Sequence, residues 1–351
     1  MSRRVLVVRS DNLGDVLLAG PAVRAVAANA DEVSFLAGPR GRAAAELLPG
    51  VDRVLSWCAP WIDPEPPAAT PASLGELRDR VRAVRPDRAL VLTSFHQSPL
   101  PMALALREAG VPWIGAISED YPGSLLDLRH RVDGDPPEPE RALSLAEAAG
   151  FRLPPGDDGK LAITGPLPDV TALTGEPGYV VVHPAASAPA REWGAERYAE
   201  AVEALVEHGY RVVLTGAPGD RELSRRIACP GALDLTGHTD LRELAAVLAG
   251  AAVVVAPNTG PAHLAAAVRT PVVSLFAPVV PAARWAPYGV PVELLGDQDA
   301  ACRDSRARRC PVAGHPCLNR VGAAEVLTAV RRLTAKRAGR VRQLEHTGGA
   351  A

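Results

Sequence analysis

Short runs of aliphatic and β-branched residues alternate with helical patterns along almost the whole chain of 351 residues. Strands that alternate with helices form parallel sheets, and helices cover both faces of such sheets. The strands are then buried on both sides, which accounts for runs that are short and apolar throughout. This alternation predicts an α/β protein built from doubly wound parallel sheets.

The predicted elements follow from these runs and from the helical periodicity between them. Strands are expected at Val5–Val8, Glu32–Leu36, Ala89–Thr93, Tyr179–Val182, Arg211–Thr215, Ala252–Ala256 and Pro271–Phe276. Helices are expected at Val16–Ala28, Leu74–Ala83, Pro101–Glu108, Glu140–Ala149, Ala195–Glu207, Arg221–Ile227, Leu241–Ala249, Pro261–Ala267 and Gly322–Leu333.

The alternation breaks between residues 151 and 178, where proline and glycine are frequent. A new strand–helix series starts at Tyr179, so we interpret this stretch as a linker between two domains. We expect a first domain at residues 1–165, a second at residues 178–334, and a disordered tail at residues 335–351. Two doubly wound domains are expected to place a ligand-binding cleft between the carboxyl ends of their strands.

The charge balance is not that of a nucleic-acid-binding protein. The 38 Lys and Arg residues against 40 Asp and Glu residues leave a formal net charge of -2, whereas neutralising phosphates requires a basic face. No apolar run reaches the ~20 residues needed to span a bilayer, and the segment Met1–Arg9 lacks the layout of a signal peptide. We therefore expect a cytoplasmic protein.

Basic residues gather in the last predicted helix and in the tail: Arg331, Arg332, Lys336, Arg337, Arg340 and Arg342. One interpretation is a peripheral contact with an anionic membrane surface or a lipid acceptor. The other is a solvated basic helix end. We favour the second because the apolar face of this helix is mostly Ala and Leu.

The cysteines are Cys58, Cys229, Cys302, Cys310 and Cys317. An odd count without a secretion signal predicts reduced thiols. Three of them lie near His315, so a zinc site is the alternative. There is no paired CxxC spacing, and we predict neither a bound metal nor a required cofactor, with a divalent metal left open.

The first polar segment that carries chemistry is Arg9–Val16, between the first predicted strand and helix. Gly14 permits a tight turn, and Asp15 then falls at the start of the helix, where Asp is a favoured N-cap. The functional interpretation is that Asp15 acts as a general base on an acceptor hydroxyl, kept ionised by the helix N-terminus. Asn12 and Gly14 are then expected on the acceptor side. The segment alone leaves both interpretations open.

A second polar segment, from His183 to Trp193, follows the first strand of the second domain. Arg191 can clamp a diphosphate with its forked donors, and Ser187 lies in the same segment. Trp193 is expected to anchor the next helix in the core. His183, at a strand end, is expected to be a structural histidine with a satisfied hydrogen bond.

Two further turns follow strands of the second domain. Gly216, in Thr215–Asp220, lets a nucleotide approach the backbone, although such a turn is ordinary in α/β proteins. In Ala256–His263, a Thr or Asn can cap the next helix and Pro261 suits its first turn. The amides of that turn can bind an anion such as a diphosphate leaving group, or the turn can be a capped helix start without a ligand.

Taken in order, these segments resemble glycosyltransferase family 9, the ADP-heptose:lipopolysaccharide heptosyltransferases, over residues 5–333. VLVVRSDNLGDVLLAGPAVRAV resembles the opening strand, Gly-Asp turn and helix of the family, and VVVHPAASAPAREWGAERYAE resembles its HPGAS…K-W segment. The segments VVLTGAPGDRE, DLTGHTDLRELAAVLAGA, APNTGPAHLAAAVRTPVVSLFAP and CPVAGHPCLNRV follow in the family's order.

The resemblance implies a GT-B fold, in which the first Rossmann-like domain binds the acceptor and the second binds a nucleotide-sugar donor. It implies transfer of a heptose or related sugar from an ADP-sugar, with inversion at the anomeric carbon. Asp15 matches the proposed catalytic base, and Arg191 stands where a Lys near the donor phosphates is usual. The donor-binding residues implied or inferred are Ser187, Arg191, Gly216, Thr239, Asn258, Thr259, Gly260, Pro261 and His263.

Three departures from the family pattern leave the donor sugar open. Asn258 replaces a usual Asp, so a carboxylate that contacts the donor sugar is missing. Pro257 replaces a usual Asn, and Ala185 replaces a frequent Gly.

Two alternatives to an inverting glycosyltransferase stay open. One is a nucleotide-sugar-binding protein that has lost catalysis, which Asn258 and Pro257 suggest. The other is a GT-B-fold sugar-nucleotide epimerase, for which His96 and Glu119 are available as acid and base. The acceptor is expected to contact the loops around Thr93–Pro99 and Ile114–Gly123. A lipid-linked or core oligosaccharide, a small glycoside and another cell-wall glycan all remain open as acceptors.

Overall fold

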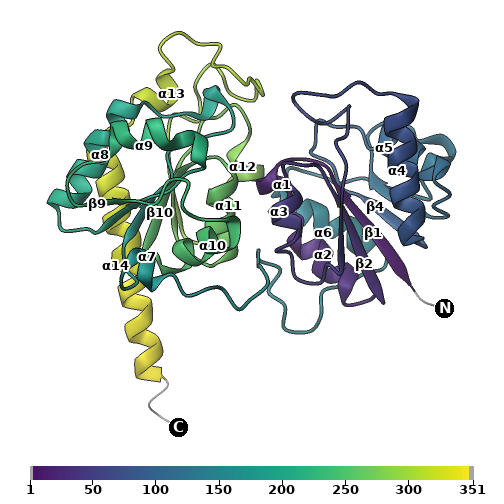
Figure 1. The fold of residues 1–351 in the computed structure, drawn as a ribbon, viewed down its shortest axis with the longest axis horizontal. Helices are drawn as coiled ribbons and strands as arrows, with labels where there is room; N and C mark the ends of the chain where they lie inside the picture. Colours follow the sequence, from purple (N-terminus) through teal and green to yellow (C-terminus); the bar gives the residue numbers. More distant parts are fainter. Residues whose placement is uncertain (1–2, 348–351) are drawn as a thin grey trace. The chain divides into compact units, whose positions relative to one another are not determined.

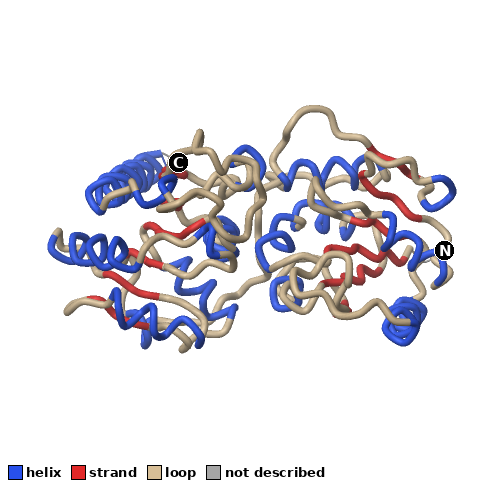
Figure 2. Tube along the Cα trace, turned by 90° about the horizontal axis from the view of Figure 1, so that it is seen from above, coloured by secondary structure: helices blue, strands red, loops and turns tan. Residues whose placement is uncertain are grey.

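The protein consists of two compact units, Met1–Thr164 and Gly165–Ala351, in a computed structural model. The structure describes residues 3–347, with their side chains through residue 335. Within the described residues, each unit contains one sheet of six parallel strands (Figure 1). Helices cover both faces of each sheet (Figure 2), as the alternation of strands and helices predicts.

The first unit has the strand order β3-β2-β1-β4-β5-β6. One face of its sheet packs on α4 and α5 through a core that includes Leu77, Met102 and Leu106, while α2 and α6 pack against each other. The strands are β1 Arg4–Arg9, β2 Glu32–Ala37, β3 Arg53–Ser56, β4 Arg88–Val91, β5 Ile114–Ile117 and β6 Leu128–His130. The helices are α1 Leu13–Leu18, α2 Gly20–Ala27, α3 Arg42–Ala45, α4 Pro71–Val84, α5 Leu100–Glu108 and α6 Glu138–Ala148, with the 3₁₀ turn η1 Gly123–Leu125.

The second unit has the strand order β12-β11-β10-β7-β8-β9. One face of its sheet packs on α8, α9 and α14 through a core that includes Tyr198, Ile227 and Val330. The strands are β7 Val180–Val182, β8 Val212–Leu214, β9 Ala232–Asp234, β10 Val253–Pro257, β11 Val272–Leu275 and β12 Val292–Leu295. The helices are α7 Thr171–Thr174, α8 Ala195–Glu207, α9 Arg221–Ile227, α10 Leu241–Gly250, α11 Gly260–Ala267, α12 Ala282–Trp285, α13 Pro316–Asn319 and α14 Ala323–Thr347, with the 3₁₀ turns η2 Pro189–Arg191 and η3 Pro218–Asp220.

Both sheets have the same doubly wound strand order. β1 pairs with β2 and β4, with Val8 opposite Leu36 and Val91. In the second unit β10 pairs with β7 and β11 in the same parallel manner. The strand order reverses between β1 and β4 in one unit and between β7 and β10 in the other. Ligands of such sheets bind outside the carboxyl ends of the strands at this switch point, so each unit has a candidate site at its own switch point.

The sequence did not predict the strands β3, β5, β6, β9 and β12 or the short helices α3, α12 and α13. Three further stretches differ from the prediction. The helix expected at Val16–Ala28 is two helices that meet at Ala19, because Pro21 has no N–H to continue the first helix. The linker expected between the domains divides at Thr164, and α7 lies inside it. The backbone is helical to Thr347 in α14, where a disordered tail was expected from residue 335; residues 348–351 lie outside the described part of the chain.

No helix among the described residues combines the length and the apolar character needed to cross a bilayer. Of the basic residues near the C-terminus, Arg332 lies 3.6 Å from Glu293. The side chains of Lys336, Arg337, Arg340 and Arg342 lie outside the described residues, so the choice between a solvated helix end and a membrane contact stays a prediction.

The five cysteines, all within the described residues, form no disulfide. Cys302 and Cys317 are buried in the core of the second unit. In the described part of the chain, no group of three or more His, Cys, Asp or Glu side chains is arranged to hold a metal ion.

Candidate functional site

A buried arginine occupies the switch point of the first unit. Arg9 is the last residue of β1, and its side chain is 2% exposed at the end of an otherwise apolar strand. A charge buried this deeply needs ionic or hydrogen-bonding partners. Its ionic partners come from three places in the chain: the loop after β1, helix α1, and the first residue of α6.

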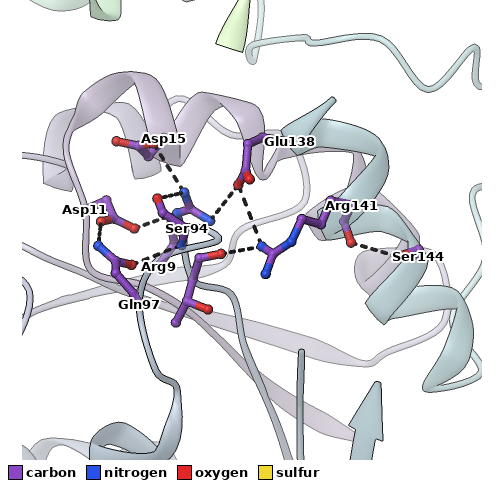
Figure 3. A network of polar contacts seen from close by, with 9 residues as sticks. Arg9, Asp11, Asp15, Ser94, Gln97, Glu138, Arg141 and Ser144 are labelled. Carbon is purple, nitrogen blue, oxygen red and sulfur yellow. Dashed lines mark hydrogen bonds and ion pairs between the residues drawn. The ribbon is translucent and has the colours of Figure 1, made fainter. Parts of the chain in front are cut away.

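Three carboxylates point at Arg9 from different sides (Figure 3). Arg9 Nε lies 2.8 Å from Asp11 Oδ2, Nη2 donates to Asp15 Oδ1 at 3.2 Å, and Nη1 donates to Glu138 Oε2 at 3.5 Å. The exposed fractions of these carboxylate side chains are 8%, 20% and 2%, respectively. Asp15 is therefore the carboxylate that a bound substrate can reach, and the other two hold the guanidinium from inside.

The loop after β4 completes this network. Arg9 Nη2 donates to Ser94 Oγ at 2.8 Å, and Gln97 Nε2 donates to Asp11 Oδ1 at 2.5 Å. Arg141 on α6 lies 3.8 Å from Glu138 and donates to the carbonyl of Thr93. The network therefore joins both strands of the switch point to α6 and fixes Asp15 through Arg9.

Burial and charge act in opposite directions on this cluster. Burial raises the pKa of Asp11 to about 6, against the attraction of Arg9. Burial alone would lower the pKa of Arg9, but Asp11, Asp15 and Glu138 together raise it, so the guanidinium stays charged. The cluster is thus a fixed cation surrounded by an excess of carboxylates.

Two predictions about the Arg9–Val16 segment are wrong in detail. Asn12, not Asp15, occupies the N-cap position of α1, and Asp15 is the third residue of the helix. Gly14 lies inside the first turn with a helical backbone and does not form the expected tight turn. Capping therefore does not account for Asp15, whose side chain is paired with Arg9. The carbonyl of Asn12 accepts a hydrogen bond from the amide of Val16, and the side chain of Asn12 makes no capping hydrogen bond.

Two glycines after β2 hold the loop that carries Asp11. A Cβ on Gly38 would lie 2.4 Å from the carbonyl oxygen of Ser10, and one on Gly41 would lie 2.9 Å from that of Asp11. A side chain at either position would push the loop away from β2. The close approach is therefore available only to glycine at these positions.

The switch point of the second unit is built differently. Arg191 Nη1 donates to the carbonyl of Asn258 at 3.2 Å and ties the loop after β7 to the turn after β10. Thr259 is the N-cap of α11, and Gly260 and Pro261 form its first turn, all partly exposed. Arg191 and this turn thus place one guanidinium and a helix start at the predicted donor end of the sheet.

The side chain of Asn258, which was predicted to contact the donor, is buried and hydrogen-bonded to the backbone. Asn258 is 4% exposed, its Nδ2 donates to the carbonyl of Ala277, and its Oδ1 accepts from the amide of Ala277, both at 3.3 Å. An aspartate could not make the first of these bonds, since a carboxylate has no donor. The Asn258 side chain, which stands in place of the usual Asp, therefore links the loops that follow β10 and β11 through these two hydrogen bonds.

The first turn of α11 offers fewer amide donors than predicted. Pro261 has no N–H, and the amide of Ala262 donates to the carbonyl of Thr259 at 3.1 Å. His263, the fourth residue of α11, is buried. An anion at this turn therefore depends on the amide of Gly260 and on Arg191 more than on a full set of helix amides.

The other predicted donor residues lie at different distances from the switch point. Ser187 is exposed in the loop after β7. Gly216 follows β8, next to β7, and its carbonyl accepts from the amide of Gly237 at 2.8 Å. Thr239 lies in the loop after the edge strand β9 and precedes Asp240, the N-cap of α10. The structure therefore brings Arg191, Asn258 and Thr259 together and leaves Thr239 farthest along the sheet edge.

His183 and Trp193 take the structural places predicted for them. His183 Nδ1 is hydrogen-bonded to Thr215 Oγ1 at 3.1 Å, and burial lowers the pKa of His183 to about 4, so the ring is neutral at pH 7. Trp193 packs edge-on against Tyr198 of α8, with ring centroids 4.7 Å apart. Both residues stabilise the loop that carries Arg191.

The sequence model of glycosyltransferase family 9 (heptosyltransferase) matches residues 75–314, more than half of the chain. The chain belongs to glycosyltransferase family 9. The matched span contains the β7–β10 switch point but begins after Asp15. The family 9 chain is accordingly similar to lipopolysaccharide heptosyltransferases in both sequence and structure.

Among relatives, lipopolysaccharide heptosyltransferase 3 of Escherichia coli K12 is 33% identical over 31% of this chain, and the match spans about a third, 33%, of that protein. Lipopolysaccharide heptosyltransferase 2 of the same strain is 29% identical over 64% of this chain and 73% of its own length. The solved E. coli heptosyltransferase WaaC, with ADP-2-deoxy-2-fluoro heptose, superposes over 94% of this chain and 99% of its own, with a TM-score of 0.72 and 22% identity. The structural likeness shows that this family 9 chain has the GT-B fold.

Sequence reasoning missed Arg9, Ser94, Gln97, Glu138 and Arg141 as members of the site. A charged residue at the end of an apolar strand is a signal that could have identified Arg9. Glu138 lies in a proline-rich stretch that predicts a loop, and nothing in the sequence indicates that it packs on Arg9.

Proposed function

We propose that this family 9 chain is an inverting glycosyltransferase that transfers a heptose or a related sugar from an ADP-sugar to a hydroxyl group of a glycan or lipid-linked acceptor. The observation that carries the proposal is Asp15, a partly exposed carboxylate at the switch point of the first unit that Arg9 holds in place. A carboxylate that is partly exposed and fixed in this way fits a general base.

The proposed reaction assigns one task to each unit. Asp15 takes the proton from the acceptor hydroxyl, and the acceptor oxygen attacks the anomeric carbon on the face opposite the diphosphate. The bond from that carbon to the phosphate oxygen breaks, and ADP leaves with the electron pair. Arg191 and the amide of Gly260 stabilise the negative charge that grows on the leaving diphosphate.

The choice of an ADP-sugar rests on likeness to relatives. The solved WaaC structure contains an ADP-heptose analogue, and this chain has the same fold with Arg191 and Thr259 at the switch point of its second unit. No carboxylate stands in the turn Pro257–His263 of this chain. The sugar held there is therefore recognised without the carboxylate that is usual at position 258.

A nucleotide panel followed by a turnover assay tests this proposal. A nucleotide present at about a hundred times its Kd stabilises the folded chain by about 2.7 kcal/mol, so ADP is expected to raise the melting temperature more than UDP or GDP. Release of ADP from ADP-heptose in the presence of an acceptor then reports transfer. A preference for UDP, or no response to any nucleotide, would contradict the assigned donor.

The second candidate is a nucleotide-sugar-binding protein without transferase activity. Asn258 supports it, because the amide is committed to the backbone of Ala277 in place of a carboxylate. ADP-heptose would then raise the melting temperature by about as much as ADP does. No ADP would be released from it with any acceptor tested.

A further inference from the structure

A small hollow lies at the carboxyl ends of β1 and β4, beside the Arg9 cluster. Its volume is ≈ 10 Å³, which is about the minimum that accommodates one water molecule or one hydroxyl group. Its lining includes Ser10, Asp11, Trp61, Ile62, Thr93 and Gln97. Asp11 and Gln97 connect the hollow to Arg9 and Asp15 (Figure 3).

Hydrogen-bonding capacity is left unused around this hollow. Among the described residues, Thr93 Oγ1 and Ser10 Oγ are buried and have no hydrogen-bond partner. Asp11 Oδ2 has the ionic contact with Arg9 but no hydrogen bond. A buried polar atom without a hydrogen bond costs about 1–3 kcal/mol, and native proteins rarely leave several together. A group that both donates and accepts would satisfy these atoms.

The charge around the hollow disfavours an anion. Asp11, Asp15 and Glu138 outnumber the guanidiniums of Arg9 and Arg141 within the cluster. Arg40, on the loop after β2, is already paired with Asp63 at 3.6 Å and Glu65 at 3.0 Å. A phosphate or carboxylate placed here would meet like charge, which costs binding energy.

The walls of the hollow are apolar on the side away from the cluster. Trp61 and Ile62 line it, and the ring of Trp61 packs against that of Trp57 with centroids 5.5 Å apart. An apolar wall that faces convergent polar groups suits a ligand with a C–H face and a hydroxyl edge, which is the chemistry of a sugar ring.

We propose that this hollow binds a second hydroxyl group of the acceptor, beside the hydroxyl that Asp15 deprotonates, and that it thereby selects an uncharged sugar as the acceptor. The inference rests on the proposed function, because it takes Asp15 as the base. Asp11 accepts a hydrogen bond from this hydroxyl, and the hydroxyl accepts one from Thr93. Thr93 and Asp11 are specificity residues in this account.

The test measures acceptor binding directly, on the full chain saturated with ADP. The probes are methyl α-D-mannopyranoside and the matching methyl mannopyranosiduronate, and binding is followed by ligand-observed saturation-transfer NMR. We expect the neutral glycoside to bind and the uronate to bind at least ~5-fold more weakly, since about 1 kcal/mol corresponds to ~5-fold.

Thr93→Val is the decisive variant, since it removes an unpartnered hydroxyl at nearly constant volume. We expect about fivefold weaker binding of the neutral glycoside, with a free energy of unfolding that is not reduced. Asp11→Asn is expected to weaken binding of the same glycoside. It should also reduce the difference in affinity between the neutral glycoside and the uronate. Ser274→Ala, which removes an equally unpartnered buried hydroxyl from β11, is the matched control and should leave glycoside binding unchanged.

The outcomes separate this inference from the proposed function. Unchanged glycoside affinity in Thr93→Val, equal affinity for the uronate, or no binding of the neutral glycoside while ADP binds would overturn the inference, and the hollow would hold a water only. Failure of ADP to bind, with glycoside binding retained and sensitive to Thr93, would instead overturn the ADP-sugar assignment and leave the hollow as a sugar site.

Discussion

The two units share a strand order and differ in the charge at the ends of their strands. At the β1–β4 switch point, a buried guanidinium is surrounded by three carboxylates, one of which reaches the surface. At the β7–β10 switch point, the buried polar side chains are an amide, Asn258, and a neutral imidazole, His183, with Arg191 as the cation. We call Asp11, Asp15 and Glu138 around Arg9 the acidic rim of the first unit, and Arg191 with the turn after β10 the cationic rim of the second. The same strand order thus carries opposite charge in the two units.

This difference shows how one topology can serve opposite chemical needs. Parallel strands bring the loops of the switch point together whatever their sequence, and the residues in those loops decide the charge. A carboxylate rim suits removal of a proton, whereas a guanidinium beside a helix start suits a diphosphate. The comparison predicts that substitutions in the two rims have separable effects.

The largest expected effect is from Arg9→Met in the first unit. Methionine fills a similar volume but removes the cation that Asp11, Asp15 and Glu138 share. Among the described residues, only Glu138 of these three keeps a second cation, Arg141. Removing one partner of a buried ion cluster costs about 3–5 kcal/mol. Urea unfolding measures the loss, and amide hydrogen exchange should locate it in residues of the first unit. A variant as stable as the wild type would show that the Arg9 cluster contributes nothing to the fold.

Arg191→Met, the corresponding change in the second unit, should act on binding more than on folding. A hydrogen bond to a charged group contributes about 1.5–3 kcal/mol, so the affinity for ADP should fall about tenfold to a hundredfold by isothermal titration calorimetry. Arg197→Met is the control, because Arg197 is exposed on α8 and paired with Glu200. Equal ADP affinities in the two variants would remove Arg191 from the donor site.

Asn258→Asp should lower stability by about 1–3 kcal/mol, because a carboxylate cannot donate to the carbonyl of Ala277 and would face it in a buried place. Urea unfolding again provides the measurement. Asn319→Asp removes a similar donor to the carbonyl of Gly314 at an exposed position, so water can replace it and the loss should be smaller. Equal losses would contradict the structural role of the Asn258 amide.

The smallest expected effect is a pH dependence of opposite sign in the two units. The pKa of Asp11 is raised from 3.8 to about 6, chiefly by burial, so between these values the folded state binds more protons and stability falls as pH rises. The pKa of His183 is lowered from 6.5 to about 4 by burial, so the unfolded state binds more protons and stability rises with pH.

Urea unfolding at pH 5 and pH 6 separates these two contributions, each at most about 1.4 kcal/mol per pH unit. Asp11→Asn should make stability increase more steeply with pH than in the wild type, and His183→Gln should make it increase less steeply. The same slope in all three proteins would mean that neither group titrates as described.

The interior strands other than β5 could be predicted from the sequence, and the four edge strands β3, β6, β9 and β12 could not. β1, β7 and β10 are buried on both faces and therefore appear as apolar runs. The edge strands β6 and β9 carry Arg129 and Asp234 because part of each strand meets water, and this interrupts the apolar pattern.

A short strand with glycine escaped prediction for another reason. Ile114–Ile117 was expected to begin an acceptor loop, but it is the buried strand β5. Gly115 interrupts its apolar run, because a Cβ there would lie 2.8 Å from the ring of Trp113. The ring of Trp113 therefore leaves room only for glycine at position 115. A contact of this kind cannot be predicted from a single sequence.

The residues of the candidate site also fall into a group that local sequence places and a group that only the fold brings together. Asp15, Arg191 and Thr259 follow strands directly, so their place at a sheet edge follows from local sequence. Glu138 lies 129 residues from Arg9 along the chain, and only the fold brings them together. The direction of a side chain, as for Asn258, also depends on its neighbours in space and cannot be predicted from its position after a strand.

The most direct test of the account is a comparison of turnover and donor affinity in Asp15→Asn. If Asp15 is the base that serves the acidic rim, release of ADP from ADP-heptose should fall by about 10²–10⁴-fold, while calorimetry shows the wild-type affinity for ADP. Turnover at the wild-type rate, or a loss of ADP affinity large enough to explain the lower rate, would contradict the division of tasks between the two units.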